Sequence, residues 1–132
     1  MPITAFYTAL LAPLFLYLSV RVIGRRREAK VALGPGDDSI LLRRMRVHAN
    51  FAEYVPFTLL SMGLAEGVGV ASLVIHIIGV VLVAGRYIHA YGVSQQPENL
   101  KLRVTGMTAT FTAIALSAIM ILVKVLPVVF AL

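Results

Sequence analysis

The sequence predicts an all-α integral membrane protein, a single-domain bundle of four transmembrane helices. Of its 132 residues, 59% are apolar and 14% are charged, whereas soluble domains average roughly 45–50% apolar and about 25% charged residues. The mean hydropathy is +0.89. Four segments each hold about 20 mostly apolar residues, the length that crosses a bilayer. A soluble four-helix bundle is the weaker alternative, because its helices should carry a charged face and these segments are apolar nearly all round.

The four expected spans are nearly free of charge. The first, third and fourth are uncharged until Arg21, Arg86 and Lys124, and the second has one formal charge after Val47, at Glu53. The expected spans are residues 3–22, 40–65, 70–92 and 105–130. The first lacks a basic start and a clear cleavage site, so we expect it to be retained as a span with the N-terminus outside.

Three polar or turn-forming segments separate these spans. Residues 24–39 are basic and then rich in Gly and Asp, so we expect them to form a loop. Residues 66–69 predict a tight turn, and residues 93–101 predict a polar connection.

The basic residues predict how the bundle lies in the membrane. Eleven of the twelve Lys and Arg residues fall at the end where the first and third spans finish, and only Lys124 lies toward the other end. This bias predicts that the basic end is cytoplasmic and that both termini are outside. The net charge of +6 follows from this topology and favours contact with anionic lipids. Nucleic acid is not an expected partner, because the basic residues flank spans and lack interleaved aromatic residues.

The absence of cysteine restricts the chemistry that the chain can perform. With no cysteine there is no disulfide, no thiolate metal site and no cysteine nucleophile. We expect no metal, and any reactive thiol must come from a substrate.

The second span carries a polar stripe. Arg46, Asn50 and Glu53 are spaced i, i+4 and i+7 on one helix face, and Tyr54 and Phe57 border it. Charges inside a bilayer are costly and usually pair or face a polar cavity. One interpretation is structural, with Glu53 paired to an arginine of another helix. A set that combines a guanidinium, an amide and an acid instead favours a binding site.

A second polar cluster ends the third span, in the stretch "GRYIHAYG". Arg86 and His89 are i, i+3 neighbours, and Tyr87 and Tyr91 are i, i+4 neighbours. The tyrosines could equally form an interfacial aromatic belt. Arg103 lies at the start of the fourth span, where the positive-inside rule also explains it.

Two further features concern helix packing. The stretch "TGMTATFTAIALSA" of the fourth span is rich in small residues, which predicts a close helix approach rather than a site. Pro13, Pro56 and Pro127 should each kink the helix that contains them.

Together these groups fit a small ligand with both carboxylates and an amine. Arginines would hold the carboxylates, and Glu53 would hold the ammonium group. A guanidinium beside a thiol favours the thiolate and so activates the thiol as a nucleophile. Clefts between helices would admit a lipophilic second substrate.

The polar residues of the second span resemble the motif of a known family. The pattern Arg-x3-Asn-x2-Glu-Tyr-x-Pro, formed by Arg46, Asn50, Glu53, Tyr54 and Pro56, resembles the second-helix signature of the MAPEG family, the membrane-associated proteins in eicosanoid and glutathione metabolism. That family includes microsomal glutathione transferases and the lipoxygenase-activating protein. The resemblance covers the whole chain, and "HANFAEYVPF" and "HAYG" look most like the bacterial members.

The resemblance implies a homotrimer in a bacterial inner membrane, with glutathione bound between neighbouring subunits near the cytoplasmic face. By position in the family, Arg46 would bind a glutathione carboxylate, Asn50 its backbone or a carboxylate, and Glu53 the γ-glutamyl amine. Arg103 matches the arginine that stabilises the thiolate and would be the catalytic residue.

The same resemblance extends the binding set to the other polar residues near the basic end. Arg86 and His89 would line the same pocket, and Tyr91 is the nearest candidate for a tyrosine that the eicosanoid enzymes carry at the position of Val93. The implied glutathione-binding residues are Arg21, Arg46, Asn50, Glu53, Tyr54, Arg86, His89 and Tyr91.

The leading hypothesis is therefore a membrane glutathione transferase or peroxidase that acts on a lipophilic electrophile or a lipid hydroperoxide. A non-catalytic lipid-binding scaffold of the same fold is an alternative, although a pure scaffold need not keep the polar set. A small multidrug transporter is a more remote alternative, because such proteins resemble one another by a glutamate in the first span, and the first span here contains no acid.

Overall fold

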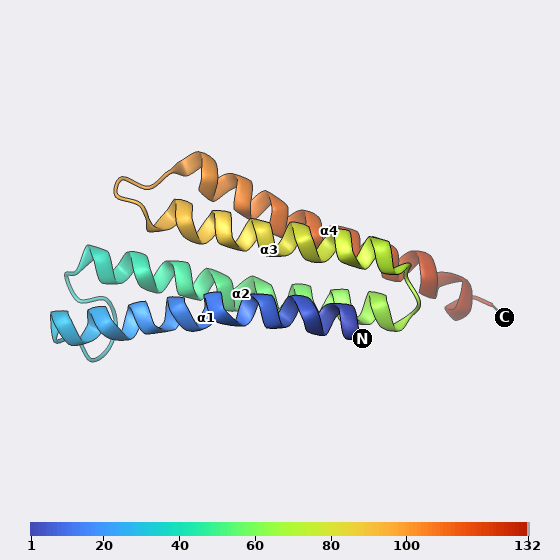
Figure 1. The fold of residues 1–132 in the computed structure, drawn as a ribbon, viewed down its shortest axis with the longest axis horizontal. Coiled ribbons are helices and arrows are strands. Elements are labelled where there is room, and N and C mark those ends of the chain that lie inside the picture. Colours follow the sequence, from blue (N-terminus) through green and yellow to red (C-terminus); the bar gives the residue numbers. More distant parts are fainter. Residues whose placement is uncertain (132) are drawn as a thin grey trace.

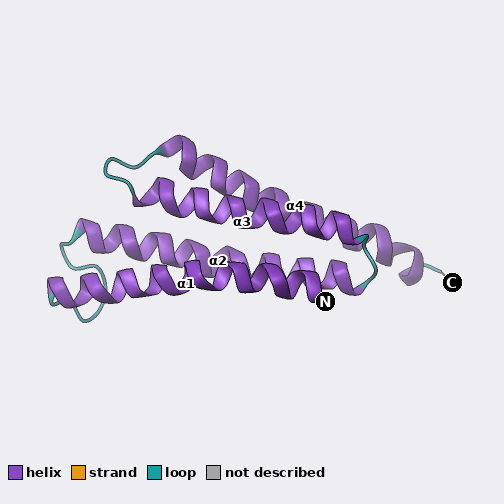
Figure 2. Ribbon diagram, in the orientation of Figure 1, coloured by secondary structure: helices purple, strands orange, loops and turns teal. Residues whose placement is uncertain are grey.

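The computed structural model describes residues 1–131 and consists of four long α-helices joined by short loops (Figure 1). No strand occurs in this part of the chain (Figure 2), so the predicted all-α class is confirmed. The helices are α1 (Pro2–Ala29), α2 (Ser39–Gly67), α3 (Ser72–Ser94) and α4 (Leu100–Val129).

The helices alternate in direction, so that the connections gather at two ends (Figure 1). The loops of residues 30–38 and 95–99 lie together at one end, which we call the basic end. Both termini and the loop of residues 68–71 lie at the other. By length and composition α1, α3 and α4 are apolar enough to cross a membrane, whereas α2, which contains the second expected span, is not among the helices that meet this criterion within the described residues. Their apolar character supports a multi-pass membrane protein.

The helices are longer than the expected spans. The prediction of a loop over residues 24–39 was wrong in its first part, because α1 continues to Ala29. Arginine, glutamate and alanine favour helix, so residues 25–29 extend α1, which ends where Lys30 adopts a left-handed backbone with a φ of 54°. α4 begins at Leu100, earlier than expected, because the Asn99 side chain accepts a hydrogen bond from the Leu102 amide and caps the helix.

Carboxylates fix two other helix ends. Asp38 accepts hydrogen bonds of 2.9 Å from the Ile40 and Leu41 amides at the start of α2. At the opposite end of the molecule, Glu66 of α2 accepts hydrogen bonds from the amides of Ile3 and Thr4, at 3.0 and 2.9 Å. Glu66 therefore caps the start of α1 from a different helix, since those first amides have no partner within α1.

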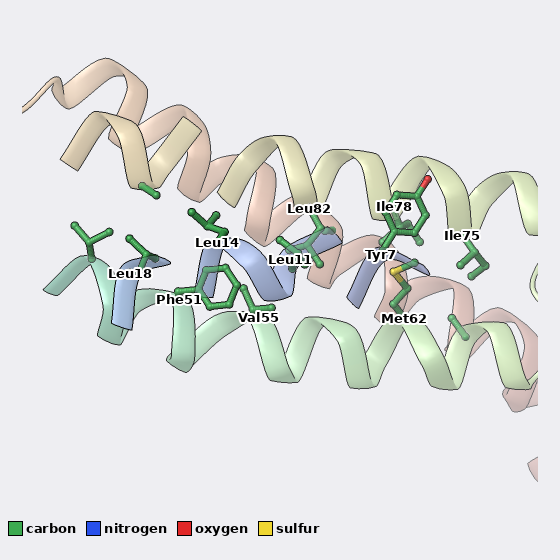
Figure 3. Close-up of a cluster of buried hydrophobic side chains, with 14 of the residues drawn as sticks. Tyr7, Leu11, Leu14, Leu18, Phe51, Val55, Met62, Ile75, Ile78 and Leu82 are labelled. Atoms are coloured by element: carbon green, nitrogen blue, oxygen red, sulfur yellow. The ribbon is translucent and has the colours of Figure 1, made fainter. Parts of the chain in front are cut away.

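The hydrophobic core lies between α1, α2 and α3 (Figure 3). On α1 it uses Leu11, Leu14 and Leu18, spaced i, i+3 and i+7 on one face. Phe51 of α2 and Leu82 of α3 meet this face. α1 and α2 continue as helix through Pro13 and Pro56 respectively.

Glycines bring α3 and α4 into close contact. A Cβ on Gly106 of α4 would lie 2.5 Å from the His89 amide nitrogen and 2.6 Å from the Gly85 carbonyl oxygen. A Cβ on Gly92 of α3 would lie 2.8 Å from the Arg103 amide nitrogen. The expectation that the fourth span packs closely through small residues is confirmed. Within residues 1–131, α1 packs on α2 and α3, and its backbone lies apart from that of α4.

Candidate functional site

A cavity of about 290 Å³ opens at the basic end between α2, α3 and α4. We call it the polar cavity. Four predicted site residues line it, drawn from all three helices. Its polar lining residues are Ser39, Arg43, Arg46, Asn50, His89, Glu98 and Arg103.

The α3–α4 contact positions His89 and Arg103 relative to each other. His89 is buried, and its Nδ1 hydrogen-bonds the Arg103 carbonyl oxygen at 3.1 Å. Gly92 lets the backbone of Arg103 approach α3. The Arg103 side chain remains about half exposed. The fixed backbone and the half-exposed guanidinium place Arg103 within reach of a ligand in the polar cavity.

Arg86 lies behind the polar cavity and does not line it. Its side chain is fully buried, and it donates a hydrogen bond of 2.7 Å to Asn50 Oδ1 and one of 3.3 Å to Thr110 Oγ1. Its guanidinium also lies 5.6 Å from the centre of the Phe51 ring. Because Asn50 lines the cavity, Arg86 orients a cavity residue from behind rather than facing the cavity itself.

Glu98 forms an ion pair with the guanidinium of Arg103. Its carboxylate accepts hydrogen bonds from the Arg103 guanidinium at 3.1 and 3.3 Å and lies 3.5 Å from Arg43. Arg43 also donates a hydrogen bond to the Val93 carbonyl oxygen. An anion that binds the Nη1 group of Arg103 therefore competes with Glu98.

Glu53 and Tyr54 lie outside the polar cavity. Glu53 is exposed on α2, and within residues 1–131 it makes no ion pair. Tyr54 is half-buried, and its ring packs edge-on against Phe111 at 5.5 Å. In a single chain, Glu53 and Tyr54 therefore lie on the outer surface of the bundle, away from Arg46 and Asn50 in the polar cavity.

Arg21 and Tyr91 line a different cavity, of about 490 Å³, between α1 and α3. We call it the α1–α3 cavity. It lies on the other face of α3 from the polar cavity, because Tyr91 and His89 are two residues apart and point in nearly opposite directions. Within one chain these two residues do not join Arg46, Asn50 and the other cavity residues.

Two charged residues of the polar cavity were not predicted, Arg43 and Glu98, nor was the polar residue Ser39. Arg43 precedes Arg46 and Asn50 by three and seven residues, so helical spacing alone could have identified it. Glu98 lies in the loop before α4, and its ion pair with Arg103 depends on how that loop folds back. No comparable signal for Glu98 exists in the sequence.

The charge of the polar cavity suits an anionic ligand. Its lining includes three arginines and one carboxylate, and guanidinium groups bind carboxylates with paired hydrogen bonds. Within residues 1–131, no group of three or more His, Cys, Asp or Glu side chains could hold a metal ion. The cavity can therefore hold a small polyanionic molecule beside a histidine and an amide.

Fold and cavity together define a class: a small, multi-pass, all-helical membrane protein with an arginine-rich cavity at one end of the bundle. The MAPEG family model matches residues 4–123. The chain is also 36% identical over 114 residues to the inner membrane protein YecN of Escherichia coli K12, covering 86% of each chain. YecN of the E. coli O6:H1 strain CFT073 matches equally. The chain belongs to the MAPEG family.

Proposed function

We propose that the protein is a membrane-bound glutathione transferase or peroxidase whose thiol site is the polar cavity. The observation that carries this proposal is the convergence of Arg46, Asn50, His89 and Arg103 from three helices on one cavity. Family membership supports it, because the MAPEG family includes glutathione transferases.

The charged residues and Asn50 of the polar cavity have proposed roles that follow from their positions. Arg46 and Arg43 bind the two glutathione carboxylates, and Asn50, oriented by Arg86, bonds the peptide backbone. Arg103 stabilises the thiolate, because a nearby positive charge favours the ionised thiol. Binding displaces the Glu98 carboxylate from Arg103.

The chemistry needs no group beyond glutathione and the second substrate. In the transferase reaction, the thiolate attacks an electrophilic carbon, a C–S bond forms, and the leaving group departs with its electron pair. In the peroxidase reaction, the thiolate attacks the peroxide, the O–O bond breaks, and an alcohol and a sulfenic acid form. A second glutathione then reduces the sulfenic acid to a disulfide and water.

We also propose a homotrimer, in which a neighbouring chain covers the exposed face of α2. The support is Glu53, an exposed carboxylate on a helix expected to lie in the membrane, where a lone charge is costly. A neighbouring chain would enclose Glu53 and Tyr54 and bring them to the glutathione amine. The basic end faces the cytoplasm in this arrangement.

The test is glutathione binding to the purified full-length chain, by calorimetry and by thermal protection in detergent or nanodiscs. We expect Arg46→Ala and Arg103→Ala to weaken binding about tenfold or more, because each removes a charge-assisted hydrogen bond. Arg27→Ala is the matched control, since Arg27 is an exposed arginine of α1 outside the polar cavity. Equal binding by all three variants, or none by the wild type, would contradict the proposal. Binding without turnover of any electrophile or hydroperoxide would favour the scaffold alternative.

A further inference from the structure

One face of α1 is exposed along its last four turns and changes from apolar to cationic. It carries, in chain order, Leu16, Val20, Ile23, Arg27 and Lys30, all of them exposed. They follow one another at alternating steps of four and three residues, so they lie on one helix face over about 21 Å. The apolar part lies in or next to the expected first span, and the two cations follow beyond it. The face therefore suits a molecule that is apolar within the membrane and anionic at the basic end.

A surface recess of about 370 Å³ lies at the cationic end of this face. We call it the α1 recess. It is lined by Ile23, Arg26, Arg27, Lys30, Val31 and Ala32. These residues include three cations and no carboxylate. The acids Glu28 and Asp38 both pair with Arg25, each at 2.9 Å, and none of these three residues lines the recess. The α1 recess is therefore a concentrated positive surface with apolar walls.

Arg26 holds the loop of residues 30–38 beside α1. Its Nη1 donates hydrogen bonds to the carbonyl oxygens of Gly34, at 2.8 Å, and of Ala32, at 3.4 Å. Both acceptors are neutral, so they leave the positive charge of Arg26 uncompensated. The loop turns back beside the last turns of α1 (Figure 1), and its Ala32 lines the same recess as Ile23.

The α1 recess lies at the level where the lipid headgroups begin. Ile23 is two residues, about 3 Å, beyond Arg21, the residue at which the uncharged stretch of α1 ends. Leu33, in the loop that Arg26 holds, is 90% exposed. A large apolar side chain held outward among cations at this level is typical of contact with a bilayer interface. A membrane lipid is therefore a better match for the recess than a soluble molecule.

The position of the cations favours a phosphate over a carboxylate. Arg27 and Lys30 lie six and nine residues beyond Arg21, so the anion that they bind lies beyond the level of the hydrocarbon chains. The phosphate of a glycerophospholipid occupies this level, whereas the carboxylate of a fatty acid directly ends its chain. Guanidinium and ammonium groups both bind phosphate, and their long side chains extend toward the membrane surface. The open apolar face also accommodates a lipid with two chains.

We propose that this face of α1 is a selective binding site for an anionic glycerophospholipid in the leaflet at the basic end. The phosphate binds Arg27 and Lys30. One acyl chain lies along Leu16, Val20 and Ile23. The net charge alone would attract anionic lipids to the whole basic end, whereas a site on α1 concentrates them at one helix face. This inference does not depend on glutathione binding, because none of these residues lines the polar cavity or the α1–α3 cavity.

The chain has no tryptophan, so Val20→Trp provides a single fluorescent reporter on the apolar part of this face. The full-length protein would be placed in phosphatidylcholine nanodiscs with increasing fractions of phosphatidylglycerol whose brominated chains quench the reporter on contact. We expect brominated phosphatidylglycerol to quench at a fraction about fivefold or more below that of brominated phosphatidylcholine. In this background, Lys30→Asn should raise the required fraction of phosphatidylglycerol about fivefold, because one charge near the membrane surface is lost.

The matched control is Lys101→Gln, since Lys101 is an exposed lysine of α4 at the basic end but outside the α1 recess. It should leave quenching unchanged. Asparagine tolerates the left-handed backbone that Lys30 adopts, and Arg27→Gln takes the place of Lys30→Asn if circular dichroism shows that the latter does not fold. The proposal fails if the two brominated lipids quench equally, if Lys30→Asn and Lys101→Gln behave alike, or if neither lipid quenches because a neighbouring chain covers this face.

Discussion

Replacing Glu98 with glutamine should strengthen glutathione binding, because Glu98 competes with the ligand for Arg103. The two side chains lie 3.1 Å apart and are 32% and 48% exposed respectively. Pairs with this exposure contribute about 0.2–1 kcal/mol. If the ligand must break this pair, its removal lowers the dissociation constant by up to about fivefold. The substitution also leaves the three arginines of the polar cavity without an opposing carboxylate.

The assay is calorimetric titration of glutathione into the wild type and Glu98→Gln at low and high salt. The gain should shrink as salt rises, because exposed charges are screened. The ultraviolet absorbance of the bound thiolate should persist to lower pH in the variant, since Arg103 is then free to stabilise it. Glu28→Gln is the matched control, because Glu28 pairs with Arg25 at 2.9 Å outside the cavity. Unchanged or weaker binding in Glu98→Gln would refute the competition.

Three further predictions concern the helix packing and the helix caps that stabilise the fold around the two cavities. Gly106→Ala should destabilise the fold by about 1–3 kcal/mol, because the new methyl group meets backbone atoms of α3. Gly24→Ala, with no atom within 4 Å of its Cβ, should not lower the melting temperature. Glu66→Ala should cost about 0.5–2 kcal/mol, the range for a lost helix cap, and should speed amide exchange in the first turn of α1. Hydrogen bonding from the Leu41 amide, with further help from Arg25, holds the pKa of Asp38 below its usual value. The stability that Asp38 contributes is therefore complete above its ordinary pKa of about 3.9 and is lost as the pH falls through the lower folded value. Asp38→Asn should reduce this acid sensitivity in melts between pH 5 and 3, and equal sensitivity would contradict it.

Helical spacing accounts for the part of the polar cavity that the sequence predicted. Arg46 and Asn50 are one turn apart on α2, so they had to share a face, and both line the polar cavity. The positions of His89 and Arg103 at the ends of two consecutive helices also brought them together. Periodicity within a helix was sufficient for Arg46 and Asn50, whereas the resemblance to the MAPEG family added His89 and Arg103 to the same predicted pocket.

The placement of Arg86 and Tyr91 required the structure. Arg86 is three residues before His89, near enough on the helix to suggest the same pocket, yet close packing against α4 encloses it completely. Spacing gives the relative directions of side chains but not which neighbour covers them. Tyr91 is two residues after His89, a spacing that already argues against a shared cavity. The sequence does not predict the position of α1, which forms the α1–α3 cavity together with α3.

The glycine contact between α3 and α4 also limits how the protein can move. α3 forms a wall of both cavities, with His89 on one side and Tyr91 on the other. Gly85 and Gly92 allow the backbone of α3 to approach the backbone of α4 closely. Rotation of α3 alone would therefore make the two backbones clash. Packed helices instead shift by small sliding motions. α3 and α4 should therefore slide as one rigid pair against α1 and α2, so that widening either cavity reshapes the other.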